Sequence, residues 1–162
     1  MSARQALGRA LGQLRSWRAA IEQYAIVVDV EPANAWAHNN LGHAALQLGD
    51  DALALAHLEI AARVGGQPVM FNNLGVAFER VGRTAEAHAA FARALELSPT
   101  YAVATMNRAR VQRLLDHGAR LAAAEALLAL RTTSASSSLS SSSSSSSSDG
   151  PLTGVAGAAH AE

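Results

Sequence analysis

The side chains that could do chemistry are the histidines and carboxylates, because the chain contains no cysteine. None of the histidines lies at a metal-ligand spacing from a carboxylate, and no His-Glu-x-x-His motif occurs. Nucleophile elbows, phosphate-binding loops and dinucleotide fingerprints are also missing from the sequence. We therefore expect a non-catalytic protein with no metal and no cofactor. The histidines are interpreted as solvated helix residues: His38, His43, His57, His88, His117 and His160.

The charge balance and the apolar content of the sequence argue against two classes of binding partner, nucleic acids and membranes. Thirteen basic residues, all arginine, balance thirteen acidic ones, whereas a nucleic-acid or anionic-membrane binder carries a basic excess. The longest apolar stretch, residues 121–130, is interrupted by Glu125 and is too short to span a bilayer. Arginines throughout residues 1–20 argue against a signal peptide. These features favour a cytoplasmic protein whose partner is neither a nucleic acid nor a membrane.

The elements that would position any site come from an internal repeat. Asn39-Asn40-Leu41-Gly42 recurs 33 residues later as Asn72-Asn73-Leu74-Gly75, and Leu7-Gly8 stands 34 residues before Leu41-Gly42. Each copy shows helical apolar spacing twice, interrupted by a short break. Helices of about 13 residues are marginal alone in water, so they must bury their apolar stripes against neighbours. The pattern predicts a stack of antiparallel helix pairs.

This repeat resembles the tetratricopeptide repeat family, whose 34-residue unit has Leu-Gly at its seventh and eighth positions. The resemblance implies an all-α, right-handed α-solenoid over residues 1–131. Its units are residues 1–34, 35–67 and 68–101, followed by a degenerate unit at 102–131. We expect that last unit to form helices at about 101–116 and 119–131, with Leu127 and Leu130 facing inward.

A compositional change separates the remainder of the chain. Thirteen of the fifteen residues from Ser134 to Ser148 are serine, and the end is rich in glycine and alanine. Such a segment buries too little apolar area to offset chain entropy. The sequence predicts a disordered tail over residues 132–162, either a flexible linker or a site of serine modification.

The family resemblance implies a concave groove lined by the first helix of each repeat, which holds a partner's peptide segment or helix. Asn40, Asn73 and Asn107 would form a ladder with one amide per repeat, because an amide can pair with any peptide unit. The alternative is that these asparagines only cap or link helices. Trp36 is either an aromatic anchor in the groove or packed against the preceding repeat. The full set of candidate groove residues is Trp36, Asn39, Asn40, His43, Asn72, Asn73, Asn107 and Arg110.

Some family members instead hold a C-terminal carboxylate with a lysine, asparagine and arginine clamp. This chain has no lysine, and the corresponding places hold Gln5, Arg9, Val69 and Asn73. We therefore do not expect that activity here.

Two further functions stay open. The segment from 119 to 131 is apolar nearly all round, so the chain could be an assembly subunit that forms a homo-oligomer through Leu121 and Leu128. It could also be the binding part of a larger enzyme.

Overall fold

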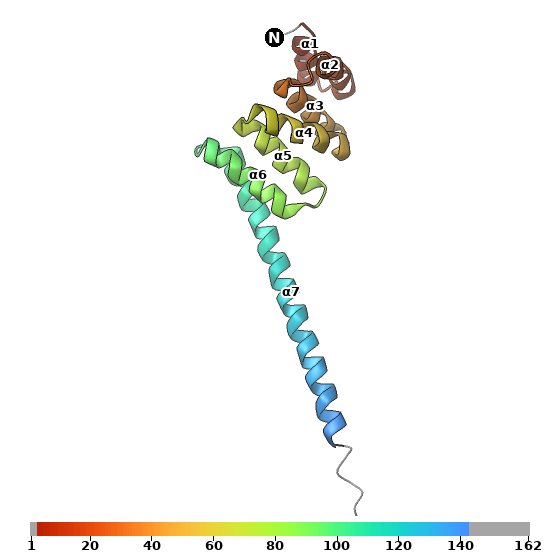
Figure 1. The fold of residues 1–162 in the computed structure, drawn as a ribbon, viewed down its shortest axis with the longest axis vertical. Helices are drawn as coiled ribbons and strands as arrows, with labels where there is room; N and C mark the ends of the chain where they lie inside the picture. The colour runs from red at the N-terminus through yellow and green to blue at the C-terminus, as the bar shows by residue number, and fades with distance from the viewer. Residues whose placement is uncertain (1–2, 143–162) are drawn as a thin grey trace, which may run out of the picture. The chain divides into compact units, whose positions relative to one another are not determined.

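The computed structural model describes residues 3–142, with side chains as far as residue 130. Over this range it contains seven helices and no strand (Figure 1). They are α1 (Ala3–Gln13), α2 (Trp17–Val30), α3 (Ala35–Leu48), α4 (Asp51–Gly65), α5 (Pro68–Arg80), α6 (Thr84–Leu97) and α7 (Ala102–Ser142). The chain divides into two units, residues 1–119 and 120–162. No helix within residues 3–142 is long and apolar enough to cross a membrane.

In the first unit the helices form hairpins that stack in chain order. The pairs are α1 with α2, α3 with α4 and α5 with α6, and successive hairpins meet where α2 packs on α3 and α4 packs on α5 (Figure 1). Each hairpin buries apolar area only with its neighbours' help, as in other repeat proteins. The predicted all-α solenoid is therefore confirmed.

Short polar breaks start and end the helices where the repeat pattern places them. The side chain of Asn34 accepts a hydrogen bond of 3.0 Å from the backbone N–H of Ala37, at the start of α3. Asp50 does the same for Leu53 at the start of α4, also at 3.0 Å. Caps of this kind stabilise a helix by about 1 kcal/mol each. Gly49 ends α3 in the left-handed conformation at φ 82°, which glycine adopts without strain.

The glycines at the eighth repeat position let the two helices of a hairpin approach closely. A Cβ atom on Gly42 would lie 2.5 Å from Leu58 Cγ, and one on Gly75 would lie 2.5 Å from Phe91 Cε1. Leu58 and Phe91 are both fully buried. The Leu-Gly pair in the sequence therefore encodes a small residue opposite a large one at each helix crossing.

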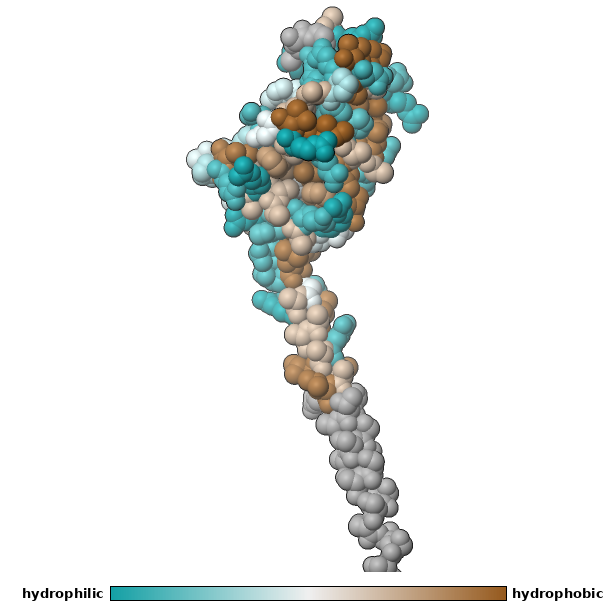
Figure 2. Space-filling model, viewed as in Figure 1, coloured by the Kyte–Doolittle hydropathy of each residue, from teal (hydrophilic) through white to brown (hydrophobic). Residues whose placement is uncertain are grey.

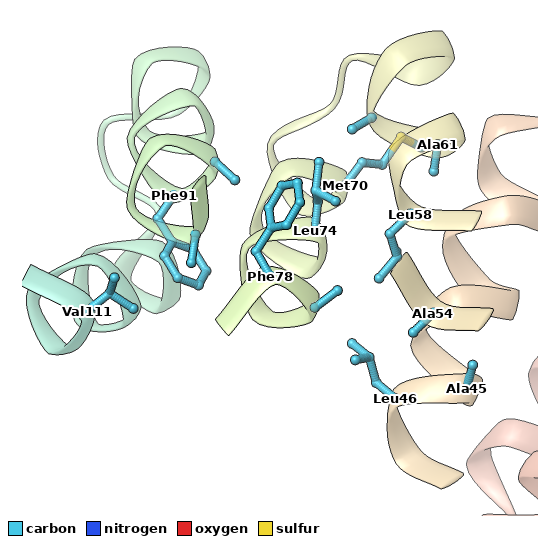
Figure 3. Close-up of a cluster of buried hydrophobic side chains, with 14 residues drawn as sticks. Ala45, Leu46, Ala54, Leu58, Ala61, Met70, Leu74, Phe78, Phe91 and Val111 are labelled. Carbon is cyan, nitrogen blue, oxygen red and sulfur yellow. The ribbon is translucent and has the colours of Figure 1, made fainter. Parts of the chain in front are cut away.

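A continuous apolar core joins the second and third hairpins and the start of α7 (Figure 3). Met70 and Leu74 of α5 lie between that helix and Leu58 of α4 (Figure 3). Val111 of α7 is fully buried in the same cluster as Phe91. The first part of α7 therefore serves as the first helix of a fourth repeat.

The prediction of a separate second helix in that fourth repeat is wrong. Helix α7 continues through Gly118 and as far as Ser142, with no break between residues 116 and 119. A single glycine costs a helix only about 1 kcal/mol relative to alanine, and the alanine- and leucine-rich segment after it propagates helix strongly. Leu127, expected to face inward, is 63% exposed. The helix also extends past residue 132, and residues 143–162 of the predicted disordered tail lie outside the described residues.

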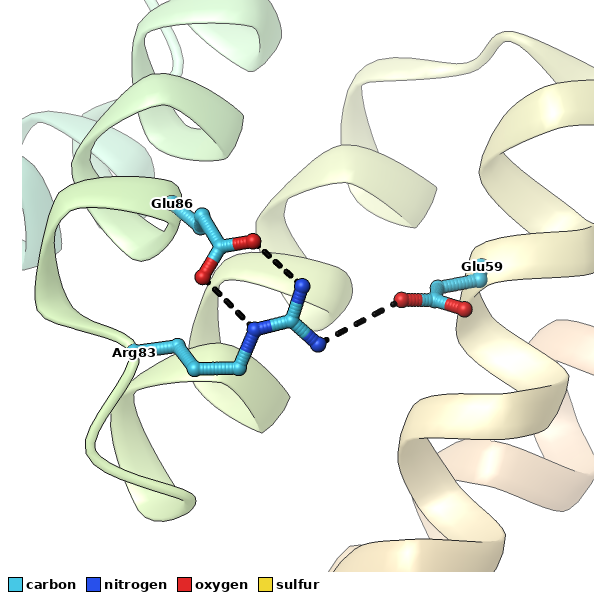
Figure 4. Close-up of polar contacts among 3 residues, drawn as sticks. All are labelled: Glu59, Arg83 and Glu86. Carbon is cyan, nitrogen blue, oxygen red and sulfur yellow. Dashed lines mark hydrogen bonds and ion pairs between the residues drawn. The ribbon is translucent and has the colours of Figure 1, made fainter.

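A charged contact joins the second and third hairpins at the surface. Arg83 forms hydrogen bonds with the carboxylate of Glu86 and an ion pair of 3.7 Å with Glu59 of α4 (Figure 4). Its guanidinium also lies 4.4 Å from the centre of the Phe78 ring. Exposed ion pairs contribute only about 0–1 kcal/mol, so this contact is secondary to the core.

Candidate functional site

The asparagines of successive repeats are linked to one another. The Asn73 side chain donates a hydrogen bond of 3.0 Å to Asn39 Oδ1, and the Asn107 side chain donates one of 3.0 Å to Asn72 Oδ1. Within a helix, Asn39 donates to Asn40 at 3.3 Å, and Asn72 donates to Asn73 at 3.5 Å. The amides thus form a hydrogen-bonded chain from α3 through α5 to α7, which we call the asparagine chain.

Burial divides the asparagine chain into two sets. Asn39 and Asn72 are only 4% and 5% exposed, so their amides serve the contacts between repeats. Asn40, Asn73 and Asn107 are half-buried. Because an amide has two N–H donors and a carbonyl with two lone pairs, these three keep capacity for further bonds. The groove candidates therefore narrow from five asparagines to three.

Charged side chains also link successive repeats. The Arg110 guanidinium contacts Glu79 through two nitrogens, at 2.5 and 2.9 Å. This pairing raises the pKa of Arg110 above its usual value. Arg80 donates a 2.8 Å hydrogen bond to the carbonyl of Leu46 and forms a 2.6 Å ion pair with Asp51. Arg110, a predicted ligand contact, thus already holds a carboxylate of the neighbouring repeat.

The first two hairpins enclose a pocket of about 260 Å³. The Trp17 and His43 rings meet there edge to face, with centroids 5.9 Å apart. Burial lowers the pKa of His43, which favours the neutral imidazole near pH 7. Burial raises the pKa of Tyr24, while the Arg9 charge and the Asn40 side chain act in the opposite direction. The lining residues are Arg9, Gly12, Gln13, Trp17, Ala20, Tyr24, Asn40, His43 and Ala44.

A second hollow, of about 320 Å³, also borders Asn40. Gln5, Asn34, Trp36 and Asn40 line it. Trp36 is 54% exposed, so its indole is presented to solvent in this hollow. Asn40 lines both cavities.

The contact between His38 and His57 departs from the sequence interpretation of solvated histidines. His38 is 5% exposed rather than solvated, and its Nδ1 lies 2.8 Å from Nδ1 of His57. His38 Nε2 lies 3.0 Å from the carbonyl of Pro32, which can only accept, so that nitrogen carries a proton. When His38 is neutral, its Nδ1 accepts and His57 Nδ1 donates the hydrogen between the two rings. No signal in the sequence pairs these residues, since the contact depends on how α3 and α4 face each other.

Other candidates have simpler surroundings. Among residues 3–130, no group of three or more His, Asp and Glu side chains could hold a metal ion. Leu121 and Leu128, the predicted association face, are 52% and 64% exposed. His160 lies outside the described residues.

Comparison of the sequence with models of known protein families shows which family this chain belongs to. Two family models, each described as a tetratricopeptide repeat, match residues 6–68 and 70–101. The chain belongs to the tetratricopeptide repeat family. The matched ranges overlap each of the three predicted repeats and end before α7 begins. The comparison with curated proteins found no match.

Several solved tetratricopeptide repeat domains have a similar fold. The first such domain of Spaghetti (RPAP3), bound to the HSP90 peptide SRMEEVD, is 22% identical with a TM-score of 0.68, covering 70% of this chain and 90% of that one. The Arabidopsis OM64 domain is 25% identical, with a TM-score of 0.65 and coverage of 68% and 92%. The second domain of human RPAP3, in complex with the HSP70 peptide SGPTIEEVD, is 22% identical with a TM-score of 0.65. That match covers 68% of this chain and 92% of the other. These similarities show the fold, and the two RPAP3 domains are the ones described with bound peptides.

Proposed function

We propose that this protein is a non-catalytic interaction module that binds an extended peptide segment of another protein along its concave groove. The observation that carries the proposal is the position of Asn40, which borders two cavities while keeping free amide capacity. Asn73 and Asn107 continue the same line, one per repeat, and the asparagine chain fixes their orientation. Pre-oriented amides lose little side-chain entropy when a ligand binds.

The ligand contacts have two parts. Asn40, Asn73 and Asn107 pair with peptide units of the ligand, whose backbone offers the same donor and acceptor whatever its sequence. The hollow beside Trp36 takes one side chain against the exposed indole, the type of residue that dominates interface energy. The amides therefore provide affinity, and the two cavities provide selectivity.

Arg9 gives the first pocket a charge preference. Its side chain is exposed at the pocket and is in none of the ion pairs formed among residues 3–130. The other pocket-lining groups are neutral, since burial favours the uncharged forms of His43 and Tyr24. We infer that an acidic or polar side chain of the ligand enters here.

The two RPAP3 domains hold chaperone peptides that end in Glu-Glu-Val-Asp. In this chain the places of the family clamp carry Gln5, Arg9, Val69 and Asn73, without any lysine. An apolar valine cannot replace a cation for a terminal carboxylate. We therefore propose an internal peptide segment as the ligand rather than a free C-terminus.

The test starts from peptides selected on the full chain from a displayed library of random sequences. Replacing Asn40, Asn73 and Asn107 together by alanine removes three bonds of roughly 0.5–1.5 kcal/mol each. Affinity for the selected peptides should then fall by about one to three orders of magnitude. Gln67→Ala is the matched control, because this exposed amide makes no side-chain capping bond at the start of α5. Undiminished binding by the folded triple variant would contradict the proposal.

A further inference from the structure

Helix α1 has an exposed apolar face, and the equivalent residues of α3 and α5 are buried. The third residue of each later repeat is completely buried, as Ala37 of α3, Met70 of α5 and Ala104 of α7. The equivalent residue of α1, Ala3, is exposed. The same position therefore changes from exposed to fully buried once another hairpin precedes it.

The next positions of the stripe behave in the same way. Leu41 and Leu74 are 2% and 8% exposed, but their counterpart Leu7 is 49% exposed. Ala44 and Ala77 are 2% and 0% exposed. Their counterpart Ala10 is again exposed. Ala3, Leu7 and Ala10 lie on one side of α1 at helical spacing, and we call them the α1 stripe.

The helix that covers this position elsewhere is the second helix of the preceding hairpin. Leu41 and Ala44 pack in one cluster with Ala20 and Tyr24 of α2. Met70 and Leu74 pack with Leu58 of α4 (Figure 3). These intramolecular contacts define what chemistry fits the α1 stripe.

The covering helices share one pattern. An alanine is followed four positions later by a large side chain and seven positions later by alanine or valine. The three sets, all at most 4% exposed, are Ala20-Tyr24-Val27, Ala54-Leu58-Ala61 and Ala87-Phe91-Ala94. Within residues 120–130 the same spacing occurs as Ala123-Leu127-Leu130. Ala123 is exposed and Leu127 is 63% exposed. Figure 2 shows hydrophobic surface on α7 directly before the grey residues.

We propose that residues 120–130 of one copy pack on the α1 stripe of a second copy, in the way that α2 packs on α3. Each copy then offers one donor helix and one acceptor stripe. Because the two surfaces differ, the contact is head-to-tail, and each added copy leaves another stripe open. This association is separate from the proposed groove function, because the α1 stripe contains none of the groove residues.

Analytical ultracentrifugation of the full chain tests the contact. The wild-type weight-average mass should rise with concentration beyond that of a dimer. Leu7→Glu and Leu127→Glu should each weaken association by more than about tenfold, because a buried leucine is replaced by a charge. Ala6→Glu, an exposed change on another side of α1, is the matched control. Ala122→Glu is the control on α7, since this exposed residue lies about 100° around the helix from Ala123.

Mixing the variants distinguishes this contact from other modes of association. Leu127→Glu keeps an intact α1 stripe, and Leu7→Glu keeps an intact donor helix. An equimolar mixture should therefore form a 1:1 dimer and stop there, while each variant alone stays monomeric with wild-type helicity. A wild-type monomer at every concentration would overturn the proposal. So would a Leu7→Glu variant that associates normally, or loss of association on Ala122→Glu but not on Leu127→Glu.

Discussion

The bond between Asn39 and Asn73 allows a quantitative test of the asparagine chain. Asn39 is 4% exposed, accepts a 3.0 Å bond from Asn73 and donates one of 3.3 Å to Asn40. Asn39→Ala removes both bonds, which at roughly 0.5–1.5 kcal/mol each predicts a loss of about 1–3 kcal/mol in unfolding free energy. Asn73→Ala leaves the buried Asn39 oxygen without that donor and should cost about 1–2 kcal/mol.

A double-mutant cycle isolates the bond itself. Urea unfolding of the full chain, followed by circular dichroism, should give a coupling free energy of about 0.5–1.5 kcal/mol between Asn39→Ala and Asn73→Ala. The control cycle pairs Asn39→Ala with Asn107→Ala, because Asn107 bonds Asn72 instead. That second cycle should be additive within about 0.5 kcal/mol. Equal coupling in both cycles, or none in either, would refute a specific chain of amide bonds.

Two further predictions concern packing and pH. Gly75→Ala should lower the melting temperature, because overpacking against Phe91 costs about 1–3 kcal/mol and exceeds the helix-propensity gain of about 1 kcal/mol. Gly118→Ala, with no atom within 4 Å of the added Cβ, should instead raise it, and the opposite order would contradict the packing argument. Burial lowers the pKa of His43 and His57 in the folded state. Their contributions to the free energy of unfolding are therefore complete above the unfolded-state pKa of about 6.5, and they are lost as the pH falls through the folded-state pKa. Urea midpoints should therefore fall between pH 7 and pH 5, and His57→Gln should reduce that difference; an unchanged midpoint would show that these rings are not buried.

The repeats could be predicted because their information is local and periodic. Gly42 and Gly75 stand at one position of the repeat, and each requires a large partner at the helix crossing, so register follows from spacing. The end of the stack could not be predicted in this way. Gly118 is typical of a break, yet whether a helix continues depends on packing partners, and none lies near it.

The site could be predicted only to the resolution of a helix face. Asn39 and Asn40 are neighbours in sequence, and which of them faces the next repeat depends on the angle between α3 and α5. The pattern therefore placed both in the groove, whereas the structure buries Asn39. The contact between His38 and His57 was missed for the same reason, because it depends on the facing sides of two helices.

The central proposal, a peptide held along the groove, is tested most directly by NMR on the full chain. Side-chain amide resonances are recorded while a library-selected peptide is added. Peptide contact predicts shifts for the amides of Asn40, Asn73 and Asn107 and for the indole of Trp36, with no shift for Gln67, an exposed amide at the start of α5 that lines neither cavity. Saturable binding that leaves these groove resonances unmoved and shifts only residues of α7 would contradict the proposal.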